Sequence, residues 1–302
     1  MEDSVFDVVI VGGGPAGLSA ALVLGRSRRR VLVCDAGEPR NAASHGLHGF
    51  LTRDGIEPAE FLHLGREQLR PYETVKLRQT KVIDANRLAN NFELTLDNGE
   101  RVSSRKLLLA TGVVDELPEI EGLAAFYGSS VFHCPYCDGW EVRDQPLAVY
   151  GRGANGSGLA LELTLWSQDL VLCSDGPSEL SDQQLHRLTR YNISVREDRI
   201  ARLEGSDGVL QHIVFANGDL LARRGVFFSA GQKQGSDLPK MLGCGFTEDG
   251  CVDTGDYETT NVPGLYVAGD ASRLVQFVIV AASEGAQAAV AINKELMKED
   301  LD

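Results

Sequence analysis

Positive charge is scarce in this chain of 302 residues. It carries 29 lysines and arginines against 43 aspartates and glutamates, which gives a formal net charge of −14 at pH 7. A protein whose main task is to grip a nucleic-acid backbone needs the opposite balance, because phosphates are bound by cations. The composition therefore argues against nucleic acid as a partner.

Long hydrophobic runs are also missing. The longest apolar stretch, near Val275–Ala282, is much shorter than the roughly 20 residues that a membrane-spanning helix needs. The acidic N-terminus leads at once into a strand pattern and lacks the features of a signal peptide. We therefore expect no membrane association and a cytoplasmic location.

Cysteines and aromatic residues are few. Six cysteines are too few for a secreted scaffold built on disulfides, and aromatic residues make up only 7% of the chain. Glycine is abundant instead, with 33 residues, which indicates many tight turns or close backbone approaches to ligands. At about 150 residues per domain, the length predicts two domains.

A dinucleotide-binding pattern opens the chain. The short apolar run Asp7–Val11 leads directly into the glycine-rich turn Gly12–Gly17 (GGGPAG), and a helical pattern follows. A second apolar strand over 31–34 then ends at Asp35. Strand, turn, helix, strand and acid in this order are typical of a βαβ unit that binds a dinucleotide.

Each part of this pattern has a physical task. Gly12 allows the tight turn, Gly14 lets the backbone approach a pyrophosphate, and Gly17 lets the helix pack close to the strand. The N-terminus of the helix offers N–H groups and the positive end of its dipole to the phosphates. Asp35 can accept hydrogen bonds from a ribose.

The same pattern recurs in the second half of the chain. Its strand, glycine-rich turn, helix, strand and acid lie at 147–150, 151–156, 157–166, 170–173 and Asp175. Each copy is followed by short strands with hairpin turns and closes with an apolar strand that ends in small residues, 107–112 in the first copy and 226–231 in the second.

The last segment does not fit the second copy. Gly264–Asp270 (GLYVAGD) is a strand that ends in Gly-Asp, and an alanine-rich helix over 281–297 follows it. We interpret this segment as a return to the first domain. The predicted fold class is α/β, with two Rossmann-like, three-layer ββα dinucleotide-binding domains. The first domain would comprise 1–115 and 240–302, and the inserted second domain 116–239.

A C-x-x-C motif, Cys134 and Cys137, lies at the start of the predicted insertion. Such a motif is either half of a zinc site or a redox-active dithiol pair. Zinc needs about four ligands, and the nearest loose candidates to complete the set are Cys244 and Cys251. We therefore expect no metal and a redox pair. Asp138 follows immediately and can hand a proton to the leaving thiolate.

These motifs together resemble the low-molecular-weight thioredoxin reductase family of pyridine nucleotide-disulfide oxidoreductases. The resemblance rests on four motifs in family order, GGGPAG at 12–17, ATG at 110–112, C-x-x-C-D at 134–138 and VAGD at 267–270. It spans nearly the whole chain. It implies FAD in the first domain, NAD(P)H binding in the second, a homodimer, and thioredoxin or another disulfide or dithiol as substrate.

The resemblance also implies residue roles. The FAD-contacting set would be Gly12, Gly14, Pro15, Ala16, Gly17, Asp35, Ala110, Thr111, Gly112, Gly269, Asp270, Gln276 and Phe277. Asp270 would hold the ribityl chain, and Gln276 with backbone near Phe277 would lie at the flavin pyrimidine edge. Cys137 would face the flavin, Cys134 would be the interchange thiol, and Asp138 would donate the proton.

One stretch departs from the family pattern. Relatives clamp the 2′-phosphate of NADPH with a His-Arg-Arg run and a further arginine, whereas this chain reads CSDGP over 173–177. Asp175 would repel a phosphate, and Arg152 stands between the first two glycines of the second loop. NADPH use is therefore left open, beside NADH, whose ribose Asp175 could bind, and a route without pyridine nucleotide.

One predicted function and three alternatives compete on these grounds. The predicted function is a thioredoxin reductase-like enzyme that passes electrons through FAD to Cys134–Cys137 and on to a protein disulfide. The alternatives are a ferredoxin-dependent form of it, a dithiol oxidase that acts on a small molecule with oxygen, and a flavin redox sensor without turnover. His133 adjoins Cys134 and as a cation could lower its pKa, while a packing role is the alternative. His48 lies in a loop that the resemblance puts near the flavin.

Overall fold

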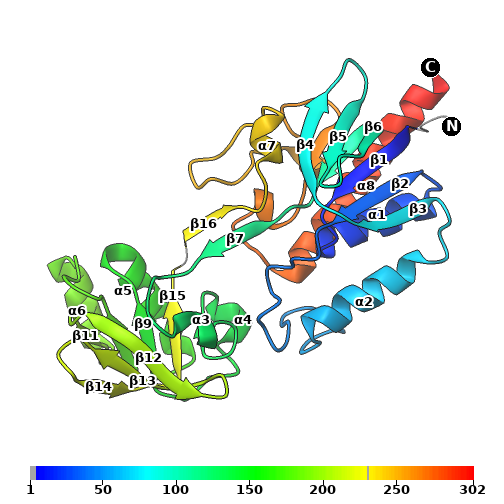
Figure 1. Cartoon of the computed structure of the whole chain (residues 1–302). Coiled ribbons are helices and arrows are strands. Elements are labelled where there is room, and N and C mark those ends of the chain that lie inside the picture. The colour runs from blue at the N-terminus through cyan, green and yellow to red at the C-terminus, as the bar shows by residue number, and fades with distance from the viewer. Residues whose placement is uncertain (1–4, 230) are drawn as a thin grey trace. The chain divides into compact units, whose positions relative to one another are not determined.

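The computed structural model describes residues 5–229 and 231–302 (Figure 1). The chain forms two compact units. Unit 1 comprises Met1–Ala42, Gly49–Val114 and Gln232–Asp302, and unit 2 comprises Ala43–His48 and Asp115–Gly231. The α/β fold class predicted from the sequence is confirmed, and both units are built around a parallel sheet.

Unit 1 contains a seven-stranded sheet in the order β3-β2-β1-β6-β5-β4, with β17 paired to the end of β6. The strands are β1 (Phe6–Val11), β2 (Val31–Asp35), β3 (Val75–Gln79), β4 (Val82–Arg87), β5 (Phe92–Leu96), β6 (Arg101–Leu109) and β17 (Leu265–Val267). The strands β3, β2, β1, β6 and β17 run parallel, and β5 and β4 continue from β6 as an antiparallel ribbon.

Both faces of the parallel strands in unit 1 are covered. Val8 and Ile10 of β1 face a core shared with α1 (Pro15–Arg26), α2 (Pro58–Leu69) and α8 (Val278–Leu301). Val9 and Val11 face a second core, which includes residues of the 238–262 segment and its short helix α7 (Leu238–Met241). Burial on both faces explains why β1 reads as a continuous apolar run instead of an alternating one.

Unit 2 has three layers. Its parallel sheet has the order β11-β10-β9-β15-β8, and a separate antiparallel sheet has the order β12-β13-β14. The strands are β8 (Val131–Phe132), β9 (Leu147–Tyr150), β10 (Leu170–Cys173), β11 (Ser194–Arg196), β12 (Ile200–Ser206), β13 (Val209–Phe215), β14 (Leu220–Ala222) and β15 (Gly225–Phe228). The helices are α3 (Leu123–Phe126), α4 (Pro135–Asp138), α5 (Gly153–Glu162) and α6 (Asp182–Arg190).

Alternate residues of β9 show the layering of unit 2. Ala148 faces the core under the antiparallel sheet, where it joins Leu210 and Phe215. Leu147 and Val149 face the opposite core, beneath α5 and α6. The parallel sheet is thus the middle layer, as in the three-layer ββα arrangement that the sequence predicts.

Two segments connect the units and pair with each other. They are β7 (Val113–Glu116) and β16 (Gly231–Gln234), which form a two-stranded sheet. The predicted strand 226–231 includes Ala230, which lies outside the described residues. Within the described part of the chain, no helix is long and apolar enough to cross a membrane.

Helix boundaries differ from the sequence prediction in two places. The predicted helix 157–166 begins at Gly153 and ends at Glu162, with a 3-10 turn over Leu163–Leu165. The last helix begins at Val278 and ends at Leu301. Glycines in the first turn of the former and β-branched residues in the first turn of the latter are tolerated because both helices are held by tertiary packing.

Candidate active site

The first glycine loop, between β1 and α1, is closed on its protein side. Gly12 has a φ of +111°, and a Cβ there would overlap the carbonyl of Ala110. A Cβ at Gly17 would overlap the Gly12 carbonyl. At Gly14, by contrast, a Cβ would meet nothing within 4 Å. Only the Gly14 side of the loop is therefore open.

The open side of this loop fits the phosphates of FAD. α1 begins at Pro15, no side chain in the described part of the chain caps its N-terminus, and its first turn has no acidic residue, so its first N–H groups can receive an anion. Thr111 lies next to this loop, since its backbone N is 3.4 Å from where a Cβ on Gly12 would be. Its Oγ1 is buried and has no hydrogen-bond partner among the described residues. A bound polar group would satisfy this hydroxyl.

Parallel pairing brings the other predicted residues of unit 1 to the same sheet edge. Ala110–Gly112 follow β6, whose Leu109 pairs with Val11 of β1. Gly269 and Asp270 follow β17, which pairs with the end of β6. The carboxyl ends of parallel strands meet at one edge of a sheet, which is where such folds bind their ligands.

Asp35 ends β2 beside this edge and is held in place by two contacts. Its Oδ1 accepts a hydrogen bond from the Gly37 N–H at 3.1 Å, and its Oδ2 lies 2.9 Å from Nη2 of Arg66 on α2. A carboxylate has about four acceptor positions, so Asp35 retains capacity for ribose hydroxyls.

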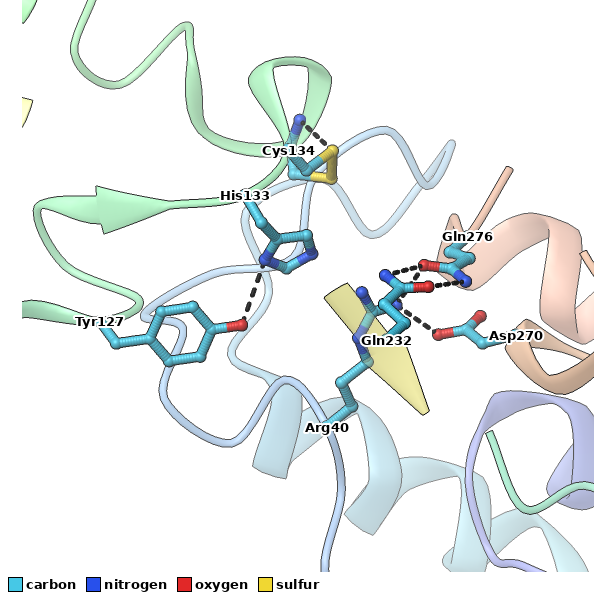
Figure 2. The surroundings of a disulfide bond; sticks show 8 residues. Arg40, Tyr127, His133, Cys134, Gln232, Asp270 and Gln276 are labelled. Atoms are coloured by element: carbon cyan, nitrogen blue, oxygen red, sulfur yellow. Dashed lines mark hydrogen bonds and ion pairs between the residues drawn. A yellow bond between two sulfur atoms is a disulfide. The ribbon is translucent and has the colours of Figure 1, made fainter. Parts of the chain in front are cut away.

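Arg40 links two of the predicted residues (Figure 2). Its Nη1 donates to Asp270 Oδ2 at 2.9 Å and to Gln276 Oε1 at 2.7 Å. Gln276 and Gln232 exchange two side-chain hydrogen bonds, at 2.8 and 2.9 Å. Phe277 follows as the N-cap residue of α8. Sequence reasoning missed Arg40, which immediately precedes the loop that contains His48. It also missed Gln232, for which the sequence offers no signal.

The second glycine loop, between β9 and α5, is bridged by its own arginine. Nε of Arg152 donates to the Ser174 carbonyl at 2.7 Å, and Nη2 donates to the Asp175 carbonyl. Nη2 also lies 3.2 Å from where a Cβ on Gly176 would be. The guanidinium therefore ties the glycine loop to the turn that follows β10.

The N-terminus of α5 is covered by the same turn. The N–H of Gly153, the first residue of the helix, donates to the Ser178 carbonyl at 2.8 Å. A Cβ at Gly153 would lie 3.5 Å from the Glu179 carbonyl. An N–H group that is already bonded to protein cannot also bind a phosphate without displacing its partner.

Asp175, the acid of the second copy, is also engaged. Its Oδ1 accepts a hydrogen bond from the Ile200 N–H at 2.7 Å, and its Oδ2 lies 3.4 Å from Nη1 of Arg199. Its φ of +51° puts the residue in the left-handed region. The carboxylate thus organises its own turn within unit 2.

Cys134 and Cys137 form a disulfide with Cα atoms 5.3 Å apart. The disulfide closes α4, a single turn that begins at Pro135 and ends before Gly139. The Cys137 N–H donates to Cys134 Sγ at 3.2 Å, an interaction that favours a thiolate after reduction. The remaining four cysteines are buried free thiols. Among the described residues, no cluster of three or more His, Cys, Asp or Glu could hold a metal ion.

Asp138 follows the disulfide and has an unusual acidity. Burial raises its pKa to about 7, the Glu141 carboxylate adds to this increase, and His48 opposes it. His48 Nε2 lies 3.5 Å from Glu141 Oε1. An acid with a pKa near 7 can both hold and release a proton at neutral pH. Sequence reasoning singled out Asp138 and His48 but missed Glu141, which looked like an ordinary surface acid.

An exposed aromatic rim, defined as Tyr136 and Trp140, lies on and beside α4, and the aliphatic Leu165 lines the same hollow as Trp140. These side chains are 60%, 65% and 73% exposed. The Arg143 guanidinium stacks 4.0 Å from the Trp140 ring. Together with Asp144 and Trp166, residues of this region line a hollow of about 490 Å³. Exposed apolar groups of this size mark contact surfaces.

Comparisons with known proteins agree with this geometry. Residues 6–285 match the model of the family described as pyridine nucleotide-disulphide oxidoreductase. The thioredoxin reductase tcpT of Claviceps purpurea is 30% identical over 98% of this chain and 96% of its own.

Solved structures show the same similarity. The crystal structure of HlmI is 38% identical, with a TM-score of 0.94 over 100% of this chain and 95% of that one. An oxidoreductase from Agrobacterium tumefaciens is 35% identical, with a TM-score of 0.91 over 97% and 99%. The chain therefore belongs to the pyridine nucleotide-disulphide oxidoreductase family and is an FAD-dependent disulfide oxidoreductase of the thioredoxin reductase type.

Proposed function

We propose that this enzyme moves electron pairs between a dithiol or disulfide substrate and FAD through Cys134–Cys137, and that NADPH is not its electron donor. The observation that carries the proposal is the disulfide on α4, followed by an acid whose pKa burial raises to about 7. The covered second glycine loop supports the statement about NADPH.

The exchange between a substrate dithiol and the disulfide is balanced in two steps. One substrate thiolate attacks Cys134 Sγ, the Cys134–Cys137 bond breaks, and Cys137 leaves as a thiolate. The second substrate thiolate then attacks the first substrate sulfur, and Cys134 leaves. The cysteine pair has gained two electrons, and Asp138 delivers the proton that a departing thiolate takes up. The reverse sequence reduces a substrate disulfide.

FAD binds unit 1 in this proposal. The open side of Gly14 and the N-terminus of α1 hold its pyrophosphate, and Asp35 holds the adenosine ribose. Asp270 and Gln276, oriented by Arg40, contact the flavin half. When bound, FAD supplies a two-electron carrier, which lets the cysteine pair exchange electrons with a second reactant.

We propose a small-molecule dithiol as the electron source and molecular oxygen as the final acceptor, so that a dithiol and oxygen give a disulfide and hydrogen peroxide. Arg152 and the 174–179 turn occupy the side of the second loop that a pyridine nucleotide would need. An enzyme that takes its electrons from a dithiol needs no second nucleotide-binding site.

A second function, reduction of thioredoxin, is favoured by a different observation. The exposed aromatic rim beside the disulfide suits a protein partner, and several relatives are named thioredoxin reductases. In this case the electrons would come from NADH or ferredoxin. A homodimer is proposed from the family resemblance alone, and light scattering would test it as a particle of twice the chain mass.

The test uses Cys134→Ser and Cys137→Ser, with Cys251→Ser as the matched control. Both site variants should keep FAD and lose dithiol-dependent oxygen uptake by at least roughly 100-fold, because a single thiol cannot close the disulfide. The control should keep its activity. Undiminished uptake in both site variants would contradict the proposal. Reduction of added thioredoxin by the wild type, with no oxygen uptake on dithiol, would select the second function.

A further inference from the structure

A buried carboxylate bonds the turn that carries Asp270. Glu284, on α8, is 5% exposed, and its Oε2 accepts a hydrogen bond from the Gly269 N–H at 2.7 Å. Gly269 and Asp270 follow β17 as a tight turn. Asp270 accepts a hydrogen bond from Arg40 at the candidate flavin site (Figure 2). All four residues belong to unit 1, and Glu284 holds the residue that immediately precedes Asp270.

Gly269 has a backbone conformation that almost only glycine adopts. Its φ is +84° and its ψ is −156°, a combination that persists only where the surrounding structure fixes it. A Cβ on Gly269 would lie 3.2 Å from the Cβ of Ala16, in the first turn of α1. The turn therefore packs against the helix whose N-terminus faces the proposed pyrophosphate site, and the bond to Glu284 fixes its conformation there.

Glu284 is itself held in one position by its neighbours. Nε of Arg273 lies 2.6 Å from Glu284 Oε1, so that each carboxylate oxygen has a partner. The next residue, Gly285, brings α8 close to α1, because a Cβ there would overlap the Ala16 carbonyl. Burial raises the pKa of the Glu284 carboxyl, and the Gly269 N–H and Arg273 both oppose this increase. A buried polar network of this kind makes its surroundings rigid.

Glu258 is a second buried acid at the same arginine and offers an internal comparison. It is 3% exposed, and its Oε2 lies 2.6 Å from Arg273 Nη2. Glu258 ends the short 3-10 turn Asp256–Glu258, whereas Glu284 comes from α8 and bonds Gly269 as well as Arg273. The two acids thus share burial and an arginine, but they differ at the Gly269 turn.

We propose that Glu284 is a positioning residue for FAD, which fixes Gly269 so that Asp270 contacts the flavin half of the cofactor. This inference rests on the placement of FAD in the proposed function. Glu284 acts through the Gly269 N–H and the peptide that joins Gly269 to Asp270, without touching FAD. When the hydrogen bond is missing, the conformational freedom of glycine lets the turn leave its position. FAD affinity then falls although every group that contacts FAD is still present.

A double-mutant cycle tests whether Glu284 acts through Asp270. The variants are Glu284→Met, Asp270→Ala and the two together. Glu258→Met is the matched control, because it also removes a buried carboxylate from Arg273 but leaves the bond to Gly269. Each holoenzyme is dialysed to equilibrium against graded concentrations of FAD, the bound flavin gives Kd, and circular dichroism checks the fold. If Glu284→Met does not fold, Glu284→Gln replaces it, because its single amide oxygen cannot accept from both Arg273 and Gly269.

We expect Glu284→Met to weaken FAD binding about tenfold, and Glu284→Gln about threefold, because one hydrogen bond is lost fully or in part. Asp270→Ala should weaken binding roughly 30-fold, since hydrogen bonds to a charged group are stronger. In the double variant the loss should stay at about 30-fold, because a side chain that is absent cannot be misplaced. Glu258→Met should keep the Kd of the wild type.

A loss of about 300-fold in the double variant with Glu284→Met, the product of two independent effects, would overturn the inference. An equal loss in Glu258→Met and Glu284→Met would overturn it too, because weakened core packing would then explain both. Unchanged affinity in Asp270→Ala would overturn the inference together with the placement of FAD. Loss of turnover in Cys134→Ser alongside any of these results would leave the proposed cysteine chemistry standing.

Discussion

The two glycine loops share a framework but differ in what covers them. In both loops the third glycine packs against the first, so that a Cβ at Gly17 or at Gly156 would overlap backbone of Gly12 or Gly151. In the first loop, Gly14 faces open space, and the α1 N-terminus has no side-chain cap in the described part of the chain. In the second loop, the equivalent glycine is covered by a following turn.

This difference shows that the fold and nucleotide binding make separate demands on the glycine loop. The strand–glycine–helix pattern is needed for close packing of a helix on a strand, and both units use it for that purpose. Binding of a nucleotide needs in addition an open loop and an acid or cations with free capacity. Unit 1 meets the first condition at Gly14, whereas in unit 2 Arg152 and the turn after β10 cover the loop. The acids Asp35 and Asp175 do not differ in this respect, because each has one backbone N–H and one arginine as partners.

The largest expected difference between the two loops comes from adding one methyl group at equivalent glycines. Gly14→Ala should fold, since its Cβ meets no protein atom within 4 Å, but it should reduce FAD affinity roughly 10- to 100-fold, because overpacking costs about 1–3 kcal/mol. Gly153→Ala is the equivalent change in the second loop and should retain its flavin. Because its φ of +51° means that an added Cβ strains the backbone there, its fold is checked by circular dichroism. The flavin-to-protein ratio after dialysis measures both. Equal flavin content in the two variants would contradict the prediction that only the first loop binds the flavin nucleotide.

A second prediction concerns proton donation by Asp138, which belongs to unit 2, the unit whose glycine loop is covered. Asp138, with a pKa of about 7, holds its proton below pH 7 and loses it above, so proton donation should decline as the pH rises through 7. Asp138→Asn should slow turnover roughly 100-fold. Glu141→Gln removes a charge that raises the Asp138 pKa, so the decline should begin at lower pH.

Rate–pH profiles of the wild type and Glu141→Gln check the second prediction. Gln211→Glu, which adds a carboxylate on β13 instead of removing one, serves as a charge control. An identical profile in the wild type and Glu141→Gln would show that Asp138 does not set the alkaline limb.

A smaller effect is expected from opening the second loop. Arg152→Ala removes the bridge to the Ser174 and Asp175 carbonyls, but it leaves the disulfide and unit 1 unchanged. Dithiol-dependent turnover should therefore stay within about twofold of the wild type, as for most partly exposed substitutions. Loss of turnover by tenfold or more would mean that the second loop takes part in catalysis. Oxygen-electrode rates at saturating dithiol decide between these outcomes.

The smallest difference between the two units should appear in the reactivity of the buried cysteines at their strand ends, where the two units are alike. Cys34 ends β2 and Cys173 ends β10, and burial raises the pKa of both thiols to about 12. Both should resist iodoacetamide in the native protein at pH 8, where the thiolate fraction would be on the order of 10⁻⁴. Mass spectrometry should find label on Cys134 and Cys137 after reduction and on neither buried thiol. Rapid labelling of Cys173 without labelling of Cys34 would indicate that local unfolding of unit 2 exposes its core to the reagent.

The sequence predicted the elements that depend on local pattern. The strands over 147–150 and 170–173 match the structure residue for residue, because short apolar runs bounded by polar or turn-forming residues have few alternatives. The motifs also singled out Ala110–Gly112 and Asp270, which the structure places at one edge of the sheet of unit 1.

The sequence could not show contacts between residues that are distant in the chain. Arg152 looked like a departure from a motif, and only the structure shows that it bonds the carbonyls of Ser174 and Asp175. Arg40 and Glu141 carry no pattern, because their roles depend on which side chains the fold brings near them. The bond between Glu284 and Gly269 is of the same kind.

The contrast between the two loops is tested most directly by anaerobic titration of the holoenzyme, with flavin absorbance as the readout. We predict that a stoichiometric amount of a dithiol such as dithiothreitol bleaches the flavin, while NADPH and NADH at the same concentration leave it oxidised. Bleaching by either nucleotide within seconds would contradict the proposal that the covered second loop has no part in electron supply.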